Sequence, residues 1–406
     1  MASLKGLTGC VRGCIIILGL FVQYSTTEKA AQDTHENLRV GSQTKTRTVT
    51  GAGASFPVAV YEVWLAAASA ANKGHVTYTY EAIGSGKGKA GLLAGTSDFA
   101  GSDSRLSPDE QKRCPDCWFV PSLAGAVAVV FNLPDFEGPL QVPRSILADI
   151  FQGKIDRWSA LAQWNPGLAG LRERIRVYVR ADKSGTTEVF TSALASFSSS
   201  FEQRIGPSSL PAWPSIVTKS AGTSTLARQV LLTEYSIGYM SIADAKKWEL
   251  PFAKIQNKGQ AFTEPSTLAV QKALEASMSD GMPASKLLYK DIVDPDPAAG
   301  GALQTAYPIA GLTYLVFNPA ALDCETLLNV LFLVYWALTD SQAAKMAEER
   351  HFASIPEALG VVITQRLGEI KCNGKNLLQQ VRFNVDKALV VFDSRVQKSA
   401  GIARSP

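Results

Sequence analysis

Three short segments of the 406-residue chain are rich in glycine, serine and threonine, and each follows a strand-like pattern and precedes a helical one. They are Gly51–Pro57, Gly84–Gly86 and Asp182–Thr187. The start of a helix leaves backbone N–H groups unpaired and carries a partial positive charge. Glycine lets a ligand approach the backbone, and hydroxyl groups add hydrogen-bond donors. Any one of these segments alone would more often be an ordinary capped helix, but three together predict an anion site.

Three charged residues accompany these segments. Arg180 and Asp182 are two residues apart, which places both side chains on one face of an extended strand. There the guanidinium would bind an oxyanion through two parallel hydrogen bonds while Asp182 holds it in place. The alternative is a surface ion pair, which contributes little. Asp103 would repel a bare anion but would accept a hydrogen bond from one that carries a proton, and this favours phosphate over sulfate.

Strand-like and helical segments alternate along the chain, which predicts an α/β fold with mainly parallel sheets. The expected strands are 48–53, 76–83, 98–102, 126–132, 175–179 and 312–318, and expected helices include 57–72, 89–94 and 188–197. Pro57 suits the first position of its helix, with Ser55 near the cap. The similar apolar strands 126–132 and 312–318 enclose a segment of its own. We therefore expect two lobes joined by two crossing strands, with a ligand cleft between them.

The N-terminus has the pattern of a signal peptide over residues 1–30, because Lys5 and Arg12 precede a short apolar run, Cys14–Val22. A membrane anchor is the alternative. A flexible leader is expected over 31–47, followed by an exported protein, secreted or periplasmic. The apolar segment Leu327–Leu338 is too short to span a bilayer and is expected to be a buried helix.

Four cysteines remain after the expected cleavage, which is an even number and favours disulfides in an exported protein. Three pairings are possible, and we favour Cys114 with Cys117 and Cys324 with Cys372, each closing a local or terminal loop. A redox-active pair or half of a zinc site at Cys114 and Cys117 remains the alternative.

Composition and motif spacing exclude several other functions. Hydrophobic residues make up 46% and charged residues 19% of the chain, which suits a folded core rather than disorder. The 40 basic and 36 acidic residues are spread along the chain without a dense basic run, so no nucleic-acid partner is expected. The histidines (His35, His75 and His351) are far apart, so we expect no metal site, and no cofactor is expected.

The pattern at Gly86–Gly91 fits a dinucleotide motif but lacks the acidic residue that should follow. A phosphatase or serine hydrolase is the remaining alternative, although no histidine stands beside Ser85 or Ser184.

Several motifs carry a family resemblance. Gly51–Pro57, Ile83–Gly86, Asp98–Asp103, Gly153–Trp158 with Asn165–Leu168, and Arg180–Thr187 resemble, in this order, the phosphate-binding protein of bacterial phosphate-specific ABC transporters. The resemblance covers roughly residues 48–370. It implies a type II periplasmic-binding-protein fold that closes over one inorganic phosphate, a non-enzymatic role, a monomer, and a membrane phosphate permease as a further partner.

The resemblance also implies residue roles and lobe limits. The ligand contacts carried over are Ser55, Phe56 (through its backbone), Ser85, Asp103, Arg180, Ser184, Gly185 and Thr186, with Asp182 as the partner of Arg180. Lobe I would comprise residues 48–132 and 305–375, lobe II residues 133–304, and a C-terminal tail residues 376–406.

The chain departs from the family pattern at several positions near the expected site. Ser55 stands where Thr is common, and Lys87 and Lys183 stand where small residues are usual. Ser104 and Arg105 follow the aspartate in place of a small residue and a proline. The two lysines are expected to raise the local positive potential and to loosen anion selectivity.

Overall fold

The computed structural model describes residues 46–72, 75–278, 292–295 and 305–386. Contacts divide the chain into residues 1–46 and residues 47–406, and the elements below belong to the second unit. The predicted signal peptide and nearly all of the predicted leader lie outside the described residues.

The strands and helices follow one another in the alternating order that the sequence predicts. The strands are β1 (Arg47–Gly53), β2 (Val76–Glu81), β3 (Phe99–Ser102), β4 (Trp118–Asn132), β5 (Gln141–Val142), β6 (Arg176–Arg180), β7 (Thr218–Ser220), β8 (Ser236–Ser241), β9 (Lys254–Gln256), β10 (Phe262–Thr263), β11 (Ala310–Phe317), β12 (Ala353–Ser354), β13 (Lys371–Cys372) and β14 (Lys375–Asn376). The α-helices are α2 (Val58–Ala71), α3 (Ser85–Leu93), α4 (Pro108–Arg113), α5 (Arg144–Phe151), α6 (Gly185–Phe197), α7 (Ser199–Arg204), α8 (Gly222–Leu232), α9 (Ile242–Lys247), α10 (Thr267–Met278), α12 (Cys324–Thr339), α13 (Ser341–Glu348) and α14 (Glu357–Leu367). Residues 378–386 are also helical.

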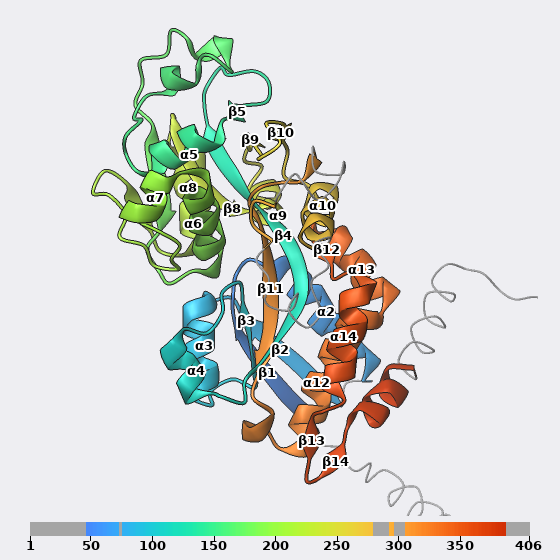
Figure 1. Cartoon of the computed structure of the whole chain (residues 1–406). Coiled ribbons are helices and arrows are strands. Elements are labelled where there is room, and N and C mark those ends of the chain that lie inside the picture. The colour runs from blue at the N-terminus through green and yellow to red at the C-terminus, as the bar shows by residue number, and fades with distance from the viewer. Residues whose placement is uncertain (1–45, 73–74, 279–291, 296–304, 387–406) are drawn as a thin grey trace, which may run out of the picture. The chain divides into compact units, whose positions relative to one another are not determined.

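The main sheet has the strand order β2-β1-β3-β11-β4-β8-β6-β7, with β12 paired to β4. Pairing is parallel toward both ends, where β1 joins β2 and β3, and β6 joins β7 and β8. In the middle, β11 runs antiparallel to β3 and β4, and β4 runs antiparallel to β8. Figure 1 shows β4 and β11 side by side, passing from one group of elements to the other. They are the two crossing strands that the repeated apolar pattern predicts.

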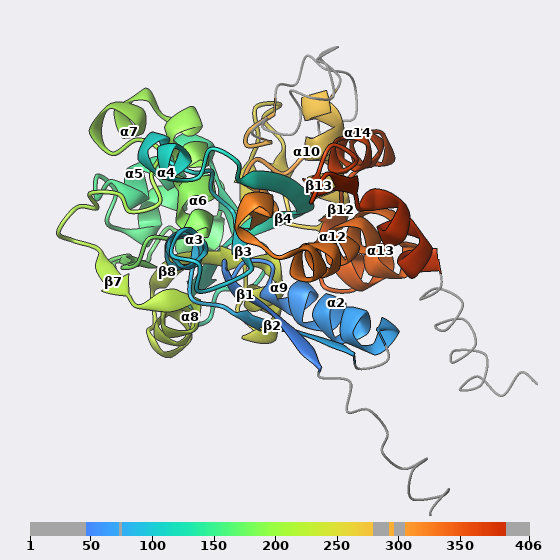
Figure 2. The same ribbon diagram turned by 90° about the horizontal axis from the view of Figure 1, so that it is seen from below.

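Helices cover both sides of the β1–β3 end of the sheet. Helices α2, α12, α13 and α14 lie on one side, and α3 and α4 lie on the other (Figures 1 and 2). The Trp64 indole N–H of α2 donates to the carbonyl of Ala343 in α13 at 2.9 Å, and its ring packs edge-on against Trp336 of α12. The predicted buried helix Leu327–Leu338 lies within α12, whose apolar residues are mostly buried.

Several element boundaries differ from the sequence predictions. Helix α3 begins at Ser85 rather than 89, so the second glycine-rich segment is itself the first turn of the helix. Glycine is a poor helix former, which hides this turn in the sequence. A Cβ at Gly88 would lie 2.3 Å from the Cα of Gly53, so only glycine lets α3 pack against β1. Strand β4 begins at Trp118, eight residues before the predicted 126, and Pro57 is the N-cap of α2 rather than its first residue.

Candidate functional site

Arg180 ends β6, and its guanidinium is held by the carboxylate of Asp182. The Arg180 Nε donates to Asp182 Oδ1 at 2.8 Å, and Nη2 donates to Asp182 Oδ2 at 2.5 Å. The Arg180 side chain is only 4% exposed. Burial raises the pKa of Asp182, but the hydrogen bonds and charge of Arg180 more than offset this, so the pKa is lowered. The guanidinium of Arg180 is therefore a buried positive charge held in one orientation by Asp182, and the two residues do not form a solvated surface ion pair.

The remaining nitrogen of the guanidinium reaches a threonine that the sequence analysis missed. Arg180 Nη1 donates to Thr223 Oγ1 at 2.8 Å, and the hydroxyl groups of Thr223 and Ser55 share a hydrogen bond of 2.9 Å. Thr223 lies in the first turn of α8, and the backbone N–H of Gly222 donates to Asp182. This segment has the same sequence pattern as the three predicted segments, in which a strand is followed by a short turn and then by a helix. Here the short strand β7 leads through Ala221 and Gly222 into α8.

Asp103 follows β3 and is buried against hydroxyl groups. Its Oδ1 accepts a hydrogen bond from Thr313 Oγ1 at 2.9 Å, and its Oδ2 accepts one from Thr186 Oγ1 at 3.3 Å. Its backbone N–H donates to Ser85 Oγ at 3.3 Å. Burial raises the pKa of Asp103 from 3.8 to about 7, against the opposing effects of the two threonines and Arg180. At neutral pH this carboxyl group is therefore poised between accepting a proton and releasing it.

The pairing of β11 with β3 brings Thr313 to Asp103, because Tyr314 lies opposite Ser102 in antiparallel register and the next position along each strand is Thr313 and Asp103. Between Thr313 and Tyr314 the register of β11 against β4 shifts, and Ser122 of β4 is the extra residue. The Ser122 hydroxyl donates to the carbonyl of Thr313 at 3.1 Å.

The starts of α3 and α6 lie against each other and against Asp103. Ser184 caps α6, its hydroxyl accepting from the N–H of Thr187, and Gly84 caps α3 in a left-handed conformation (φ 92°). A Cβ at Gly185 would lie 2.5 Å from Ser85 Oγ, and one at Gly84 would lie 3.0 Å from Asp182 Oδ2. Only glycine permits these approaches.

The structure thus brings the three predicted segments and Asp103 into one cluster, buried in its larger part, to which Thr223 and Thr313 are added. Phe56 differs from the other expected ligand residues, since its ring is buried in the core and packs edge-on against Phe352. Its expected role is through the backbone, which leaves the ring free for this packing. The hydroxyl groups of Ser85 and Ser184 accept hydrogen bonds from backbone N–H groups of Asp103 and Thr187.

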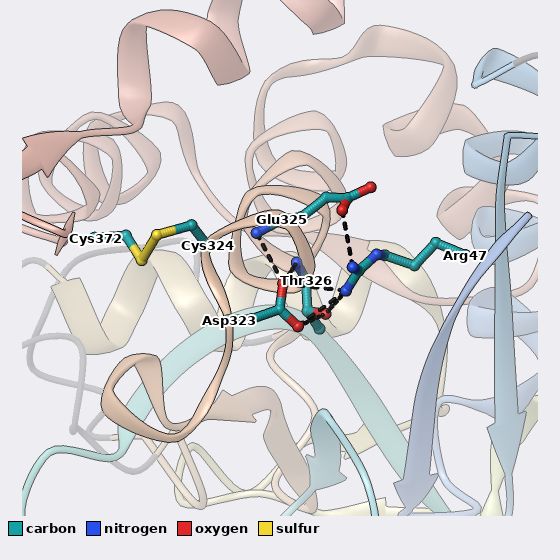
Figure 3. The surroundings of a disulfide bond; sticks show 6 residues. All are labelled: Arg47, Asp323, Cys324, Glu325, Thr326 and Cys372. Carbon is teal, nitrogen blue, oxygen red and sulfur yellow. Dashed lines mark hydrogen bonds and ion pairs between the residues drawn. A yellow bond between two sulfur atoms is a disulfide. The ribbon is translucent and has the colours of Figure 1, made fainter. Parts of the chain in front are cut away.

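Both favoured disulfides are present. Cys114 is bonded to Cys117 beside α4, and Cys324 at the start of α12 is bonded to Cys372 in β13. Figure 3 shows the second bond at the start of α12, where Arg47 contacts Asp323, Glu325 and Thr326 from the other side. The two carboxylates are well exposed, so the ion pairs between β1 and the start of α12 contribute little, whereas the disulfide joins the start of α12 covalently to β13. Among the described residues, no group of three or more histidine, cysteine or acidic side chains is placed to hold a metal ion.

Comparison with known proteins places the chain in a family. Residues 38–329 match the model of the PBP superfamily domain. The phosphate-binding protein PstS of Pasteurella multocida is 30% identical over 342 residues, covering 83% of this chain and 95% of the relative. The PstS of Xylella fastidiosa is 32% identical over 320 residues, covering 78% and 84%. The chain belongs to the PstS family of phosphate-binding proteins.

Solved structures bear out the fold expected of a PstS protein. A high-affinity periplasmic phosphate-binding protein (PfluDING) with bound phosphate superposes with a TM-score of 0.60 at 20% identity, covering 81% of this chain and 97% of the other. The fold is therefore the α/β, type II periplasmic-binding-protein fold, with two lobes and two crossing strands. Within the part of the chain that the structure describes, every helix falls short of the length and apolar character needed to cross a bilayer.

Proposed function

We propose that this chain binds one inorganic phosphate ion between its lobes, as an exported receptor for phosphate uptake. The proposal rests on one observation: a buried, carboxylate-held guanidinium and a buried carboxyl group of raised pKa belong to the same cluster of hydroxyl groups and helix starts. Arg180 supplies the charge that the anion needs, and Asp103 supplies an acceptor for the proton that it carries. The binding-protein names of the PstS relatives support the same ligand.

Each residue has a stated role in this proposal. Arg180 binds two phosphate oxygens and Asp182 orients it, while Asp103 accepts the phosphate proton. The donors to the remaining oxygens are Ser55, Phe56 through its backbone, Ser85, Ser184, Gly185 and Thr186. The lobes proposed to close over the ion are residues 48–132 with 305–375 and residues 133–304.

The choice of phosphate over sulfate follows from Asp103. Sulfate carries no proton near neutral pH, so an ionised Asp103 would face it at a buried position with no hydrogen to accept. If Asp103 is ionised, two negative charges meet in a site of low dielectric. If Asp103 is protonated, it can donate to sulfate, but the hydrogen bonds from Thr313 and Thr186 favour its ionised form. Holding the proton on Asp103 therefore costs free energy as the pH rises above about 7.

Calorimetric titration with phosphate and sulfate tests the proposal. We expect Arg180→Ala to weaken phosphate binding by about 3–5 kcal/mol, since a buried charged contact is lost. Arg180→Lys should restore only part of that loss, because lysine lacks the planar fork. Asp103→Asn should narrow the preference for phosphate over sulfate. Unchanged phosphate affinity in Arg180→Ala would overturn the site, and an unchanged preference in Asp103→Asn would overturn the account of selectivity.

We further propose that the protein acts outside the cytoplasm and delivers phosphate to a membrane permease. The signal-peptide pattern at the N-terminus and the two disulfides support export, because disulfides persist in oxidising compartments. Cell fractionation with N-terminal sequencing of the mature protein tests this, and an intact N-terminus in the cytoplasmic fraction would contradict it.

A further inference from the structure

Three charged residues join the two sides of the anion site. Glu110 in α4 forms ion pairs with Lys89 of α3 at 3.1 Å and with Lys183 at 3.2 Å. Lys89 and Glu110 flank the segment that follows Asp103, whereas Lys183 immediately precedes Ser184 in the segment after β6. Figure 1 shows α3 and α4 next to each other below α6. The cluster, which we call the Lys89–Glu110–Lys183 triad, therefore connects two segments that are 73 residues apart in sequence.

Lys89 fixes the backbone that carries Asp103. The Lys89 side chain is 2% exposed, and its ammonium group donates to Ser104 Oγ at 3.2 Å and to the carbonyl of Arg105 at 2.6 Å. Such a buried cation needs a carboxylate partner, and Glu110 is that partner. Glu110 is itself held in place by a capping box, in which Ser107 N–H donates to its carboxylate and Ser107 Oγ accepts from its backbone N–H.

Lys183 contacts the first turn of α3 in two further ways. Its backbone carbonyl accepts a hydrogen bond from the N–H of Gly86 at 3.2 Å. A Cβ at Gly86 would lie 2.7–2.9 Å from the Cβ, Cγ and Cδ atoms of Lys183, so the aliphatic stem of the lysine lies directly on that glycine. The ammonium group then continues to Glu110. Packing and a backbone hydrogen bond therefore tie Lys183 to α3, and an ion pair ties it to α4.

We propose that Glu110 and Lys183 are positioning residues that hold the anion site closed. Separating the segment after β6 from α3 and α4 breaks the Lys183–Glu110 ion pair and the Gly86–Lys183 hydrogen bond together. The triad therefore slows the release of the bound anion, and it does so without touching it. This inference rests on the proposed function for its ligand, phosphate, but the tie between the segments exists with or without one.

The electrostatic potential of Glu110 and its proposed role in holding the site closed, which we call the closure model, predict opposite effects of a substitution at Glu110. A carboxylate beside an anion site repels the anion, so if only the electrostatic potential mattered, Glu110→Gln would tighten phosphate binding. Under the closure model the same substitution speeds release, because Lys183 loses its partner. Lys87 provides a matched control for the lysine, since it is an exposed lysine of the same first turn of α3.

Stopped-flow measurement of phosphate release tests the inference. We expect Lys183→Met to speed release by about threefold to fivefold at low salt, which is the range of a partly exposed ion pair. Lys87→Met removes an equal charge from the same turn, so its effect on the release rate measures the loss of positive potential alone and should be smaller than that of Lys183→Met. Near 1 M NaCl, where the Debye length is ~3 Å, the effect of Lys183→Met should shrink. Equal effects of the two substitutions, or slower release in Glu110→Gln, would overturn the closure role.

A ligand-free measurement keeps this test separate from the proposed function. Hydrogen exchange of the amides of residues 84–88 and 183–187 should quicken in Lys183→Met and not in Lys87→Met, in phosphate-free buffer. Because Glu110→Gln leaves the buried Lys89 without its partner, Lys89→Met with Glu110→Gln is the variant to use if the single substitution does not fold. Unchanged exchange would refute the tie itself, whereas a parent protein that binds no phosphate would refute only the proposed function.

Discussion

Replacing Asp103 by asparagine should stabilise the ligand-free protein, and by more at high pH than at low pH. Burial raises the pKa of Asp103 from 3.8 to about 7. A group whose pKa is raised on folding contributes stability below its unfolded pKa and loses it as the pH rises through the folded one. A pKa shift of about three units corresponds to about 4 kcal/mol of unfolding free energy, at about 1.36 kcal/mol per unit, once the pH lies above both pKa values. Asparagine does not titrate, so the variant escapes this loss.

The size of the effect between two accessible pH values follows from the same pKa. At pH 5 the native carboxyl group is protonated while the unfolded one is mostly ionised, so part of the loss has already occurred. The gap in unfolding free energy between Asp103→Asn and the parent should therefore widen by about 2.5 kcal/mol between pH 5 and pH 8. Asparagine still accepts from Thr313 through Oδ1 but cannot accept from Thr186 through its amide nitrogen, so the substitution has a cost, which is similar at both pH values.

Urea unfolding in phosphate-free buffer, followed by tryptophan fluorescence, measures this gap. Asp182→Asn is the control, because that carboxylate is ionised and bonded to Arg180. It should lower stability at both pH 5 and pH 8. A gap that stays constant with pH, or an Asp103→Asn variant less stable than the parent at pH 8, would refute the assignment of a buried, destabilised carboxyl group to Asp103.

Two further predictions concern the cluster and the disulfides. Thr223→Val should weaken phosphate binding by roughly tenfold or more by calorimetry, since one charged hydrogen bond to Arg180 is lost, and Thr223→Ser should retain it. Equal affinities in Thr223→Val and the parent would contradict this role. Replacing both Cys324 and Cys372 by serine should cost about 4 kcal/mol in urea unfolding, and replacing Cys114 and Cys117 only about 2 kcal/mol, because the closed loops differ in length. A larger loss for the shorter loop would contradict the chain-entropy account.

Much of the fold could be predicted from the sequence, because the signals are local. Strands β1, β3 and β6 and helices α2 and α6 lie within a few residues of their predicted positions, and β4 and β11 follow their continuous apolar runs. The start of α3 could not be predicted from propensity, since its glycines serve a close approach to β1 that no local pattern contains. The early start of β4 at Trp118 likewise depends on pairing with β11.

The sequence by itself determined which segments carry donors for an anion, which arginine and aspartate share a face, and which cysteines close the shortest loops. These depend on residue type and spacing within a few positions. Only the tertiary structure decided that Thr223 and Thr313 join the cluster, since they reach Arg180 and Asp103 from 43 and 210 residues away. It also decided the raised pKa of Asp103 and the partners of Glu110. Burial and contact between distant segments produce both, and neither is encoded in the neighbouring residues.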